Sequence, residues 1–440
     1  MGDGMGGLTG FAVSHWGDDP WARGSWSLIG RDGSPRDRIA LGTPVADRLR
    51  IAGEATHPTR AGMTHGAYEE GVAAAAWAAA AGHTRIAVVG AGMAGLGAAR
   101  ALTGQGAGVV IWEARDRIGG RTAPAEIDGA VFDLGANWLQ QFDDNVLASL
   151  AEKLSLRLVA TDFNDPLVLD GPHSPARPGT PSSSAHRPRR REPAQSRAAA
   201  SIEAELRRRL ESAAAGESVA DVLEAWRRAP GAWDMDAVRR FVDAEIVMDS
   251  GAPLSWLSAR HGFEPGVGEG DRWIVGGYRL LTDHLAEGLD VRLRHPVGRI
   301  VVDAAGVTLS GDAGSLRVDA VIVTVPLGVL AAGDIRFEPP LPEPHRAALS
   351  RLGTGRVEKV VLRFAERFWP SHPAGYHRVH GPGENCVSEW LDATEADGVP
   401  TLVGLFAGPW LDDLWSGTDE RIATRTATVI ERAAATRPDH

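Results

Sequence analysis

Residues 84–121, TRIAVVGAGMAGLGAARALTGQGAGVVIWEARDRIGGR, decide the fold of this chain. An apolar, β-branched run at 86–89 meets the turn GAGMAG (90–95), a helix-forming stretch follows, and a second apolar run at 109–112 ends in Glu113. The stretch has the order that a dinucleotide-binding βαβ unit requires, namely strand, glycine-rich turn, helix, second strand and terminal acid. We therefore predict such a unit here.

The three glycines of this turn have separate predicted roles. Gly90 permits a tight turn, Gly92 lets the backbone approach a pyrophosphate, and Gly95 lets the helix pack closely on the strand. The N-terminus of the helix offers unpaired N–H groups to the phosphates. Glu113, about twenty residues further on, is placed to bind ribose hydroxyls.

Composition limits the class of protein. A chain of 440 residues is long enough for two domains. Its 43% hydrophobic and 23% charged residues are typical of a soluble globular protein. The net charge of -11 argues against general binding to nucleic acid or to an anionic membrane.

Cysteine content and hydropathy limit the compartment. The single cysteine, Cys386, excludes an intramolecular disulfide and leaves no cysteine cluster for a metal. We expect no secretion signal, because the N-terminus lacks a basic stretch followed by an apolar one. No apolar run reaches the roughly eighteen residues of a membrane-spanning helix. These features predict a cytoplasmic protein with no metal site.

The residues after the second strand separate flavin enzymes from nicotinamide enzymes. The sequence EARDRIGGR (113–121) resembles the extended fingerprint of FAD enzymes of the flavin amine oxidase family. The resemblance implies an α/β fold, in which a Rossmann-like FAD-binding domain is joined to an α+β substrate-binding domain. It also implies that Arg121, the arginine of the GGR turn, contacts the pyrophosphate.

The first eighty residues resemble the C-terminal segment of the same family. The matching pieces, in order, are HWGDDP (15–20), RGSWS (23–27), RLRIAGEAT (48–56) and THGAYEEG (64–71). Residues 50–52 predict a short strand whose sharp exit at Gly53 and Glu54 leads toward the cofactor. Residues 64–80 predict an alanine-rich helix that begins at a threonine N-cap. The resemblance implies that its N-terminus points at the flavin ring, where the positive end of the helix dipole would stabilise negative charge.

The order of segments in this chain is therefore predicted to be circularly permuted relative to the family, with the family's C-terminal segment first. Residues 81–84 form a short linker between the end of that segment and the first strand of the βαβ unit. Residues 400–431 resemble the family segment that normally runs into the Trp-x-x-Asp-Pro stretch. A chain whose ends lie close together tolerates such a rearrangement. The alternative is that the N-terminal segment completes a neighbouring chain by domain swapping.

Two later segments resemble cofactor-facing parts of the family. The sequence AVFDLGANW (130–138) ends in a GANW turn, which in the polyamine oxidase branch passes the flavin and begins the substrate tunnel. Plant members carry an acid two residues beyond the tryptophan, whereas this chain has Gln140, so a charge that would attract a polycation is missing. Residues 273–336 contain GGY, a predicted antiparallel pair (306–309 with 316–318) and a further strand that runs into Pro326.

The predicted domains are discontinuous. The FAD-binding domain comprises 31–141 and 274–334, and the substrate-binding domain comprises 1–30, 142–273 and 335–440. Helical periodicity at 142–161 and 201–247 suits a helical part of the latter. Residues 171–197 are rich in Pro, Ser and Arg and predict a disordered linker, with a basic docking arm as the alternative.

Three residues are the predicted catalytic set. Lys359, in LGTGRVEKVVLRF (352–364), falls on the family lysine that reaches flavin N5 through water. Trp26 and Tyr68 match the two aromatic positions that flank the substrate amine. Ser25 occupies the position of the cysteine that bonds to flavin in animal monoamine oxidases, so FAD is expected to be non-covalent.

The implied reaction is the removal of a hydride from the α-carbon of a primary, secondary or polyamine to give an imine. O2 would be reduced to H2O2, and no metal is needed. Two alternatives remain: an L-amino-acid oxidase, which needs an arginine for the carboxylate, and a non-catalytic flavin-binding protein. The expected partners are a small-molecule amine and O2, with no nucleic acid and no membrane, in a monomer or a homodimer. The predicted cofactor-binding residues are Gly90, Gly92, Met93, Ala94, Gly95, Glu113, Ala114, Arg115, Gly120, Arg121, Gly135, Ala136, Asn137, Trp138, Val297, Thr324, Val325, Pro326, Gly53, Glu54, Gly66 and Ala67.

Overall fold

The predicted βαβ unit is present. The computed structural model describes residues 7–163, 165–169, 193–231, 233–263 and 270–435. In it β4 (Arg85–Val89) leads through the GAGMAG turn into α3 (Met93–Gly104), which returns to β5 (Gly108–Trp112). The two strands are parallel neighbours, with Ile86 opposite Val109. The predicted order of strand, turn, helix and parallel strand is confirmed for this stretch.

The unit belongs to a five-stranded sheet in which every pair of neighbours is parallel. Side chains alternate along β4. Ile86 and Val88 lie in one hydrophobic core with α3, and Ala87 and Val89 lie in a second core on the opposite face. Both faces are therefore covered, which explains why the strand is an uninterrupted apolar run. The strand order is β12 (Asp290–Arg292), β5, β4, β16 (Ala320–Val323), β3 (Leu49–Ile51).

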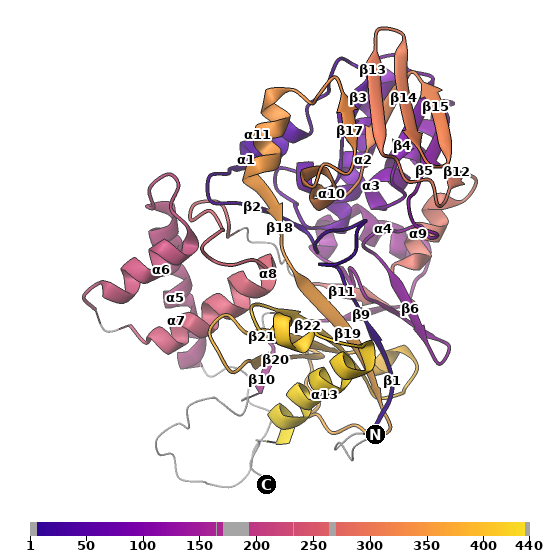
Figure 1. Cartoon of the computed structure of the whole chain (residues 1–440). Helices are drawn as coiled ribbons and strands as arrows, with labels where there is room; N and C mark the ends of the chain where they lie inside the picture. The colour runs from indigo at the N-terminus through magenta and orange to yellow at the C-terminus, as the bar shows by residue number, and fades with distance from the viewer. Residues whose placement is uncertain (1–6, 164, 170–192, 232, 264–269, 436–440) are drawn as a thin grey trace, which may run out of the picture.

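Helices cover one face of this sheet and a second, smaller sheet covers the other (Figure 1). The predicted antiparallel pair at 306–318 is confirmed as part of the smaller sheet. Its edge strand, β17 (Arg336–Glu338), lies beyond the predicted domain boundary at residue 334. The covering elements are α2 (Thr64–Ala80), α3 and α9 (Arg279–Ala286) on one face, and β15 (Gly314–Val318), β14 (Gly306–Gly311), β13 (Arg299–Asp303), β17 (Arg336–Glu338) and α10 (Leu327–Ala331) on the other, with α1 (Pro35–Leu41) against α11 (Glu343–Arg351).

Helix α2 has the predicted bounds, but its first residue has a different role. Met63 is the N-cap residue, so Thr64 is already helical. The Thr64 hydroxyl instead pairs with the Tyr278 hydroxyl at 2.8 Å, and Tyr278 donates to the Trp138 carbonyl at 2.7 Å. This chain of contacts ties the start of α2 to the GANW turn.

A six-stranded sheet forms the lower half of the molecule in Figure 1. Along β19, Val360 and Leu362 pack in a core with α13, whereas Val357 and Val361 face a second core that contains Trp138. Lys359 has the same parity as Val357 and Val361, so strand alternation directs it to the second side. The order is β1 (Leu8–Val13), β19 (Val357–Phe364), β22 (Thr401–Ala407), β21 (Val387–Asp392), β20 (Tyr376–His380), β10 (Leu167–Leu169), with α13 (Asp419–Ala435) against β1 and β19.

A helical lobe projects to the left in Figure 1 and confirms the helical prediction for 201–247. Of the predicted linker, residues 171–192 lie outside the described part of the chain, and helix α5 begins within its last five residues. The lobe consists of α5 (Pro193–Glu211), α6 (Val219–Arg228), α7 (Met235–Val242), the π-helical turn η3 (Asp243–Val247) and α8 (Met248–Ser250).

The helical prediction for 142–161 is only partly right. Helix α4 covers Val146–Lys153, and Ser155 then adopts a left-handed φ of 54°, which stops the helix. Strand β9 (Leu158–Ala160) follows and pairs with β11 (Arg272–Ile274). The remaining short elements are β6 (Pro124–Ile127), β7 (Ala130–Asp133), β8 (Trp138–Leu139), η1 (Glu54–Thr56), η2 (Phe142–Asp144), η4 (Thr394–Ala396) and α12 (Leu411–Leu414).

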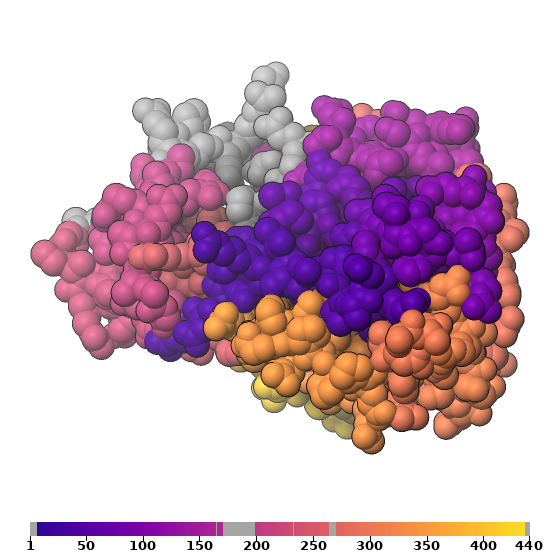
Figure 2. Space-filling model, turned by 90° about the horizontal axis from the view of Figure 1, so that it is seen from above, coloured from indigo at the N-terminus to yellow at the C-terminus, as the bar shows by residue number. Residues whose placement is uncertain are grey.

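The N-terminal segment packs throughout on later parts of the same chain. Strand β1 pairs with β19, β3 pairs with β16, and β2 (Ser27–Ile29) pairs with β18 (Leu352–Thr354). Figure 2 shows this indigo segment between the pink helical lobe and the orange region on one face. Among the described residues, no helix is both long enough and apolar enough to cross a membrane.

Candidate active site

One cavity of about 660 Å³ is lined by most of the predicted site residues. Its walls come from the ends of the parallel sheet, from strands β19, β20 and β21 of the six-stranded sheet, and from the helical lobe. Every predicted cofactor or catalytic residue except Gly66, Tyr68 and Gly95 lines it. Segments as distant in sequence as residues 26 and 359 therefore meet at one site.

The glycine-rich turn has the geometry that a dinucleotide cradle needs. Gly90 has a left-handed φ of 104°, which favours glycine. A Cβ on Gly95 would overlap the Gly90 carbonyl oxygen, so only glycine allows the helix to sit this close to the strand. A Cβ on Gly92 would have its nearest neighbour, the Gly120 Cα, at 4.0 Å, so this position stays open to the cavity. Gly95 thus allows α3 to pack closely on the turn, although it does not line the cavity.

We expect Gly95→Ala to reduce the flavin content of the purified protein and to lower its free energy of unfolding by about 1–3 kcal/mol, because the new methyl group forces α3 away from Gly90. Gly104→Ala, in the same helix but with open space around its Cβ, is the matched control and should be neutral or slightly stabilising. Flavin absorbance per protein and urea unfolding report both effects. Equal flavin content in the two variants would contradict the role of Gly95.

Glu113 lies at the cavity end of β5, as predicted. Its carboxylate is buried and accepts the Ala91 N–H at 2.7 Å and the Arg115 N–H at 2.9 Å. These bonds hold the acid beside the glycine-rich turn. The Arg115 guanidinium turns to Asp19 at 2.6 Å, so this part of the N-terminal segment is joined directly to the βαβ unit.

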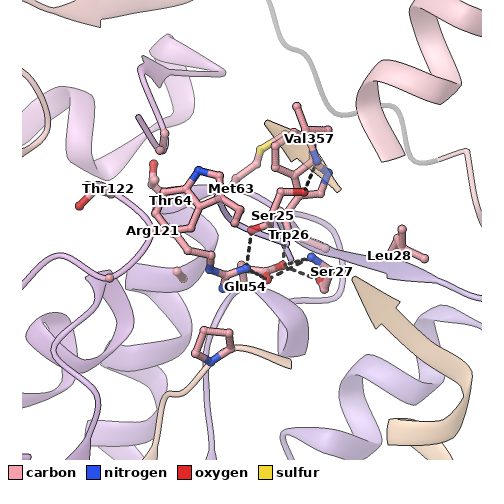
Figure 3. Close-up of a pocket in the computed structure, with 18 of the residues that line it drawn as sticks. Ser25, Trp26, Ser27, Leu28, Glu54, Met63, Thr64, Arg121, Thr122 and Val357 are labelled. Atoms are coloured by element: carbon pink, nitrogen blue, oxygen red, sulfur yellow. Dashed lines mark hydrogen bonds and ion pairs between the residues drawn. The ribbon is translucent and has the colours of Figure 1, made fainter. Parts of the chain in front are cut away.

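Arg121 is held by a buried acid from the N-terminal segment (Figure 3). It donates to Glu54 at 3.0 Å and to the Ser25 carbonyl at 2.8 Å. Glu54 also accepts the Ser27 hydroxyl at 2.5 Å and the Gly62 N–H at 2.8 Å. Burial opposes ionisation of Glu54, but Arg121, the Ser27 hydroxyl and Arg38 outweigh it and lower the pKa of the carboxyl. The result is a fixed anion and cation at the cavity wall.

Lys359 is buried at the wall of the cavity. Its ammonium donates to the Gly135 carbonyl and to the Asn137 side-chain oxygen, and it lies 5.0 Å from the centre of the Trp138 ring. Burial lowers the pKa of Lys359, and the nearby Asp133 carboxyl opposes that shift. Burial likewise raises the pKa of Asp133, whose carboxylate accepts the Tyr278 N–H at 3.0 Å. The GANW turn therefore holds the lysine in place.

The predicted aromatic pair is not brought together. Trp26 lines the cavity, but Tyr68 turns toward α3, where a Cβ on Gly97 would lie 2.9 Å from its ring. Position 68 lies one turn into α2, on the side that packs against α3. Met63, at the N-cap, lines the cavity instead and appears beside Trp26 in Figure 3. Gly66 does not line the cavity either, because it packs against the Arg60 carbonyl.

Several cavity residues were missed by sequence reasoning. Tyr376 and Phe163 pack edge to face with their ring centres 4.6 Å apart, and Phe163 makes the same contact with Trp138 at 4.8 Å. Arg378 and Glu389 lie directly opposite each other on β20 and β21 and form an ion pair at 2.6 Å. The available signal was one charge of opposite sign in the middle of each of two neighbouring strands, YHRVH (376–380) and VSEWLD (387–392).

The donors present fit a dinucleotide with a ring system. The open face of Gly92 leaves room for a pyrophosphate. The indole N–H groups of Trp112 and Trp138 both belong to residues that line the cavity, and they are buried without a hydrogen-bond partner. No group of three or more His, Cys, Asp or Glu side chains within the described residues is arranged to hold a metal ion.

Comparison with known proteins gives a consistent result. A family model described as flavin containing amine oxidoreductase matches residues 8–78 and 93–439. Probable polyamine oxidase 4 of Arabidopsis thaliana is 30% identical over 378 residues, which cover 80% of this chain and 72% of that protein. Polyamine oxidase 3 of Oryza sativa subsp. japonica is 32% identical over 373 residues, or 78% of this chain and 72% of that protein.

Solved structures share the architecture. A double mutant of putrescine oxidase has a TM-score of 0.60 and 25% identity, and the match covers 80% of this chain and 81% of that chain. Cyclohexylamine oxidase from Brevibacterium oxydans IH-35A has the same TM-score at 23% identity, over 80% of this chain and 82% of that chain. The second similarity shows the fold alone.

Proposed function

Because this chain belongs to the flavin-containing amine oxidoreductase family, we propose that it is an amine oxidase that holds FAD non-covalently in the cavity and uses O2 as the electron acceptor. Flavin-dependent oxidation of amines follows from the family and from its polyamine oxidase relatives. The choice of FAD, the non-covalent attachment and the acceptor are our proposals. Ser25 supports non-covalent binding, because its hydroxyl donates to the Gly355 carbonyl at 3.1 Å and no sulfur stands in its place.

The residues that would hold the cofactor come from three segments. The GAGMAG turn and the N–H groups at the start of α3 suit the pyrophosphate, and Glu113 suits the adenosine ribose. Thr324 to Pro326 close the sheet beside Gly90, where Thr324 donates to the Val89 carbonyl at 2.9 Å. When bound, the flavin supplies a two-electron acceptor that takes a hydride from the amine α-carbon and returns the electrons to O2 as H2O2.

The protein's own side chains bind and orient the amine. Trp26, Trp138 and Tyr376 line the cavity, and aromatic side chains suit an amine and keep bulk water away from it. When protonated, the buried Lys359 side chain places a positive charge at the cavity wall that favours the formation of negative charge near it. The observation that carries the proposal is that Lys359, held by Asn137 and Gly135, lines the same cavity as the glycine cradle.

An L-amino-acid oxidase is supported less well. Such an enzyme needs an arginine that is available for the substrate carboxylate. Arg378 is committed to Glu389 and Arg121 to Glu54, so each of these cavity arginines already has a carboxylate partner.

We also propose that the family order is circularly permuted within one two-part architecture. Strand β3 adds to the edge of the parallel sheet beside β16. Helix α2 packs against α3 and is joined to β4 by only four residues, 81–84. Strand β1 packs against α13, so early and late segments adjoin. A gene rearranged to begin at Thr84, with residues 7–80 joined after α13 by a flexible linker, should give a flavin-containing enzyme; an apoprotein with native helix content would contradict the permutation.

The proposed function has a direct test. The purified protein should be yellow, release FAD into the supernatant on denaturation, and produce H2O2 with members of a panel of monoamines, diamines and amino acids. Mass analysis of the released cofactor identifies FAD and its non-covalent state together. Colour without peroxide from any amine would favour the non-catalytic flavin-binding alternative, and peroxide with amino acids alone would favour the amino-acid oxidase.

A further inference from the structure

Lys359 is a buried amine whose hydrogen-bond partners, among the described residues, are neutral. Its Nζ donates to the Gly135 carbonyl and to the Asn137 side-chain oxygen, and the Trp138 ring lies beside it. Burial favours the uncharged form of an amine, because water no longer stabilises the ammonium. A carboxylate close by is therefore needed if Lys359 is to carry a positive charge at neutral pH.

Asp133 is the acid that lies directly behind the GANW turn. It is the last residue of β7 and stands two positions before Gly135. Residues 134–138 line the cavity, whereas the Asp133 side chain is buried and does not. Two backbone hydrogen bonds, of 2.8 and 3.0 Å, fix this segment on residues 121–123. The acid is thus held on the same rigid segment that binds the lysine.

The Asp133 carboxylate has few hydrogen bonds for a buried anion. Both of its oxygens accept one and the same backbone N–H, that of Tyr278, at 3.0 and 3.2 Å. The backbone closes tightly on the acid here, since a Cβ on Gly277 would lie 2.8 Å from an Asp133 oxygen. A single N–H does not offset the cost of burying a carboxylate. The acid therefore depends on a nearby cation.

Asp133 and Lys359 each provide the charge that the other lacks. Burial raises the pKa of Asp133, whereas the Tyr278 N–H, Lys359 and Arg279 oppose that shift. Burial lowers the pKa of Lys359, and the Asp133 carboxylate opposes that shift. Each group thus stabilises the charged form of the other.

The other titratable groups around this pair are neutral, exposed or engaged elsewhere. Burial raises the pKa of the Tyr278 hydroxyl, and Arg279 is exposed at the start of α9. Glu358, the neighbour of Lys359 on β19, accepts N–H groups of residues 16 and 17 on the opposite side. Strands β1 and β22, which flank β19, carry no titratable side chain. Beyond β22, Glu389 is paired with Arg378 at 2.6 Å.

We propose that Asp133 keeps Lys359 protonated from behind the cavity wall and is thereby a positioning residue for the reaction of the reduced flavin with O2. The part of this inference that concerns O2 rests on the proposed function. Because Asp133 does not line the cavity, it acts through Lys359 alone. The buried pair gives the wall a positive charge on the cavity side and its counter-charge on the protein side.

NMR of the holoenzyme tests the pair without turnover. The chain contains two lysines, Lys153 and Lys359, so isotopic labelling at lysine Cε gives two signals, which Lys153→Met assigns. Asp133→Asn should lower the midpoint of the Lys359 titration by about one pH unit or more, the usual effect of removing a nearby opposite charge. Asparagine keeps the shape of the side chain and can still accept the Tyr278 N–H. Asp133→Ser, which can accept it too, is the second uncharged variant in case the first does not fold.

Asp271→Asn is the matched control. Asp271 is also buried, accepts one backbone N–H, that of Gln141, at 3.0 Å, and has its pKa raised by burial. It should leave the Lys359 midpoint at the wild-type value. An unchanged midpoint in the uncharged Asp133 variants, or an equal shift in Asp271→Asn, would overturn the inference.

Oxygen kinetics connect the pair to the reaction. In photoreduced Asp133→Asn, the pH at which the O2 reaction slows should fall by the same interval as the NMR midpoint, so the rate above that pH drops about tenfold for each unit. Asp133→Asn added to Lys359→Met should change the rate no further. A further loss in the double variant would overturn the positioning role. A wild type without bound flavin would instead contradict the proposed function, while the lysine titration of the same protein still decides whether Asp133 holds the Lys359 proton.

Discussion

Lys359→Met is expected to slow the reaction of the reduced enzyme with O2 by about 10²–10³-fold while flavin remains bound. This is the usual loss of rate when one preorganised group that stabilises developing charge is removed from an active site. The physical reason is the buried position of the ammonium, which Asn137 and Gly135 hold at the cavity wall. Methionine has a similar length and no charge, so it removes the cation with little change in packing. Stopped-flow mixing of the photoreduced enzyme with O2 measures the rate directly.

The chain supplies its own control for this variant. Lys153 is the other lysine in the sequence, and it is exposed at the end of α4. Lys153→Met should therefore have the oxygen kinetics of the wild type. If Lys359→Met also reacted with O2 at the wild-type rate and contained full flavin, Lys359 would have no role in the oxidative half-reaction.

Arg378→Met should lower the free energy of unfolding by about 3–5 kcal/mol, the usual cost of removing one partner from a buried ion pair. Arg378 and Glu389 are both less than a tenth exposed, and the substitution leaves the buried Glu389 carboxylate without its ion-pair partner. Urea unfolding followed by circular dichroism gives the change.

The matched control is Arg317→Met. Arg317 forms an ion pair of similar length, 2.8 Å, with Asp303, but both partners are about half exposed. Because solvent screens such pairs, this variant should lose less than about 1 kcal/mol. Equal losses in the two arginine variants would show that the Arg378 pair is not buried in the folded protein.

Local patterns predicted the parts of the fold that depend on neighbouring residues. The βαβ unit follows from residues 84–121 alone, because strand, turn and helix signals stand in one continuous stretch. The bounds of α2 followed from an alanine-rich run in the same way. Lys359 could be placed because residues 352–364 resemble the strand that carries the family lysine, and the alternation of β19 agrees with a side chain that faces the cavity.

The missed features depend on long-range geometry. Tyr68 and Met63 are five residues apart, and only the packing of α2 on α3 decides that Met63 reaches the cavity. The pairing of Arg378 with Glu389 needs the register of β20 against β21. The cavity-facing position of Asp249 depends on a π-helical turn, which interrupts the 3.6-residue period that sequence patterns assume.

Flavin-dependent amine oxidation is tested most directly by adding an amine to the yellow protein anaerobically while the visible flavin absorbance is recorded. A flavin-dependent amine oxidase must lose that absorbance as the amine is oxidised and regain it when O2 is admitted. We expect this bleaching and recovery with an amine substrate, and bleaching followed by a slow recovery in Lys359→Met. Absorbance that persists in the wild type with every amine tested would contradict flavin-dependent amine oxidation by this protein.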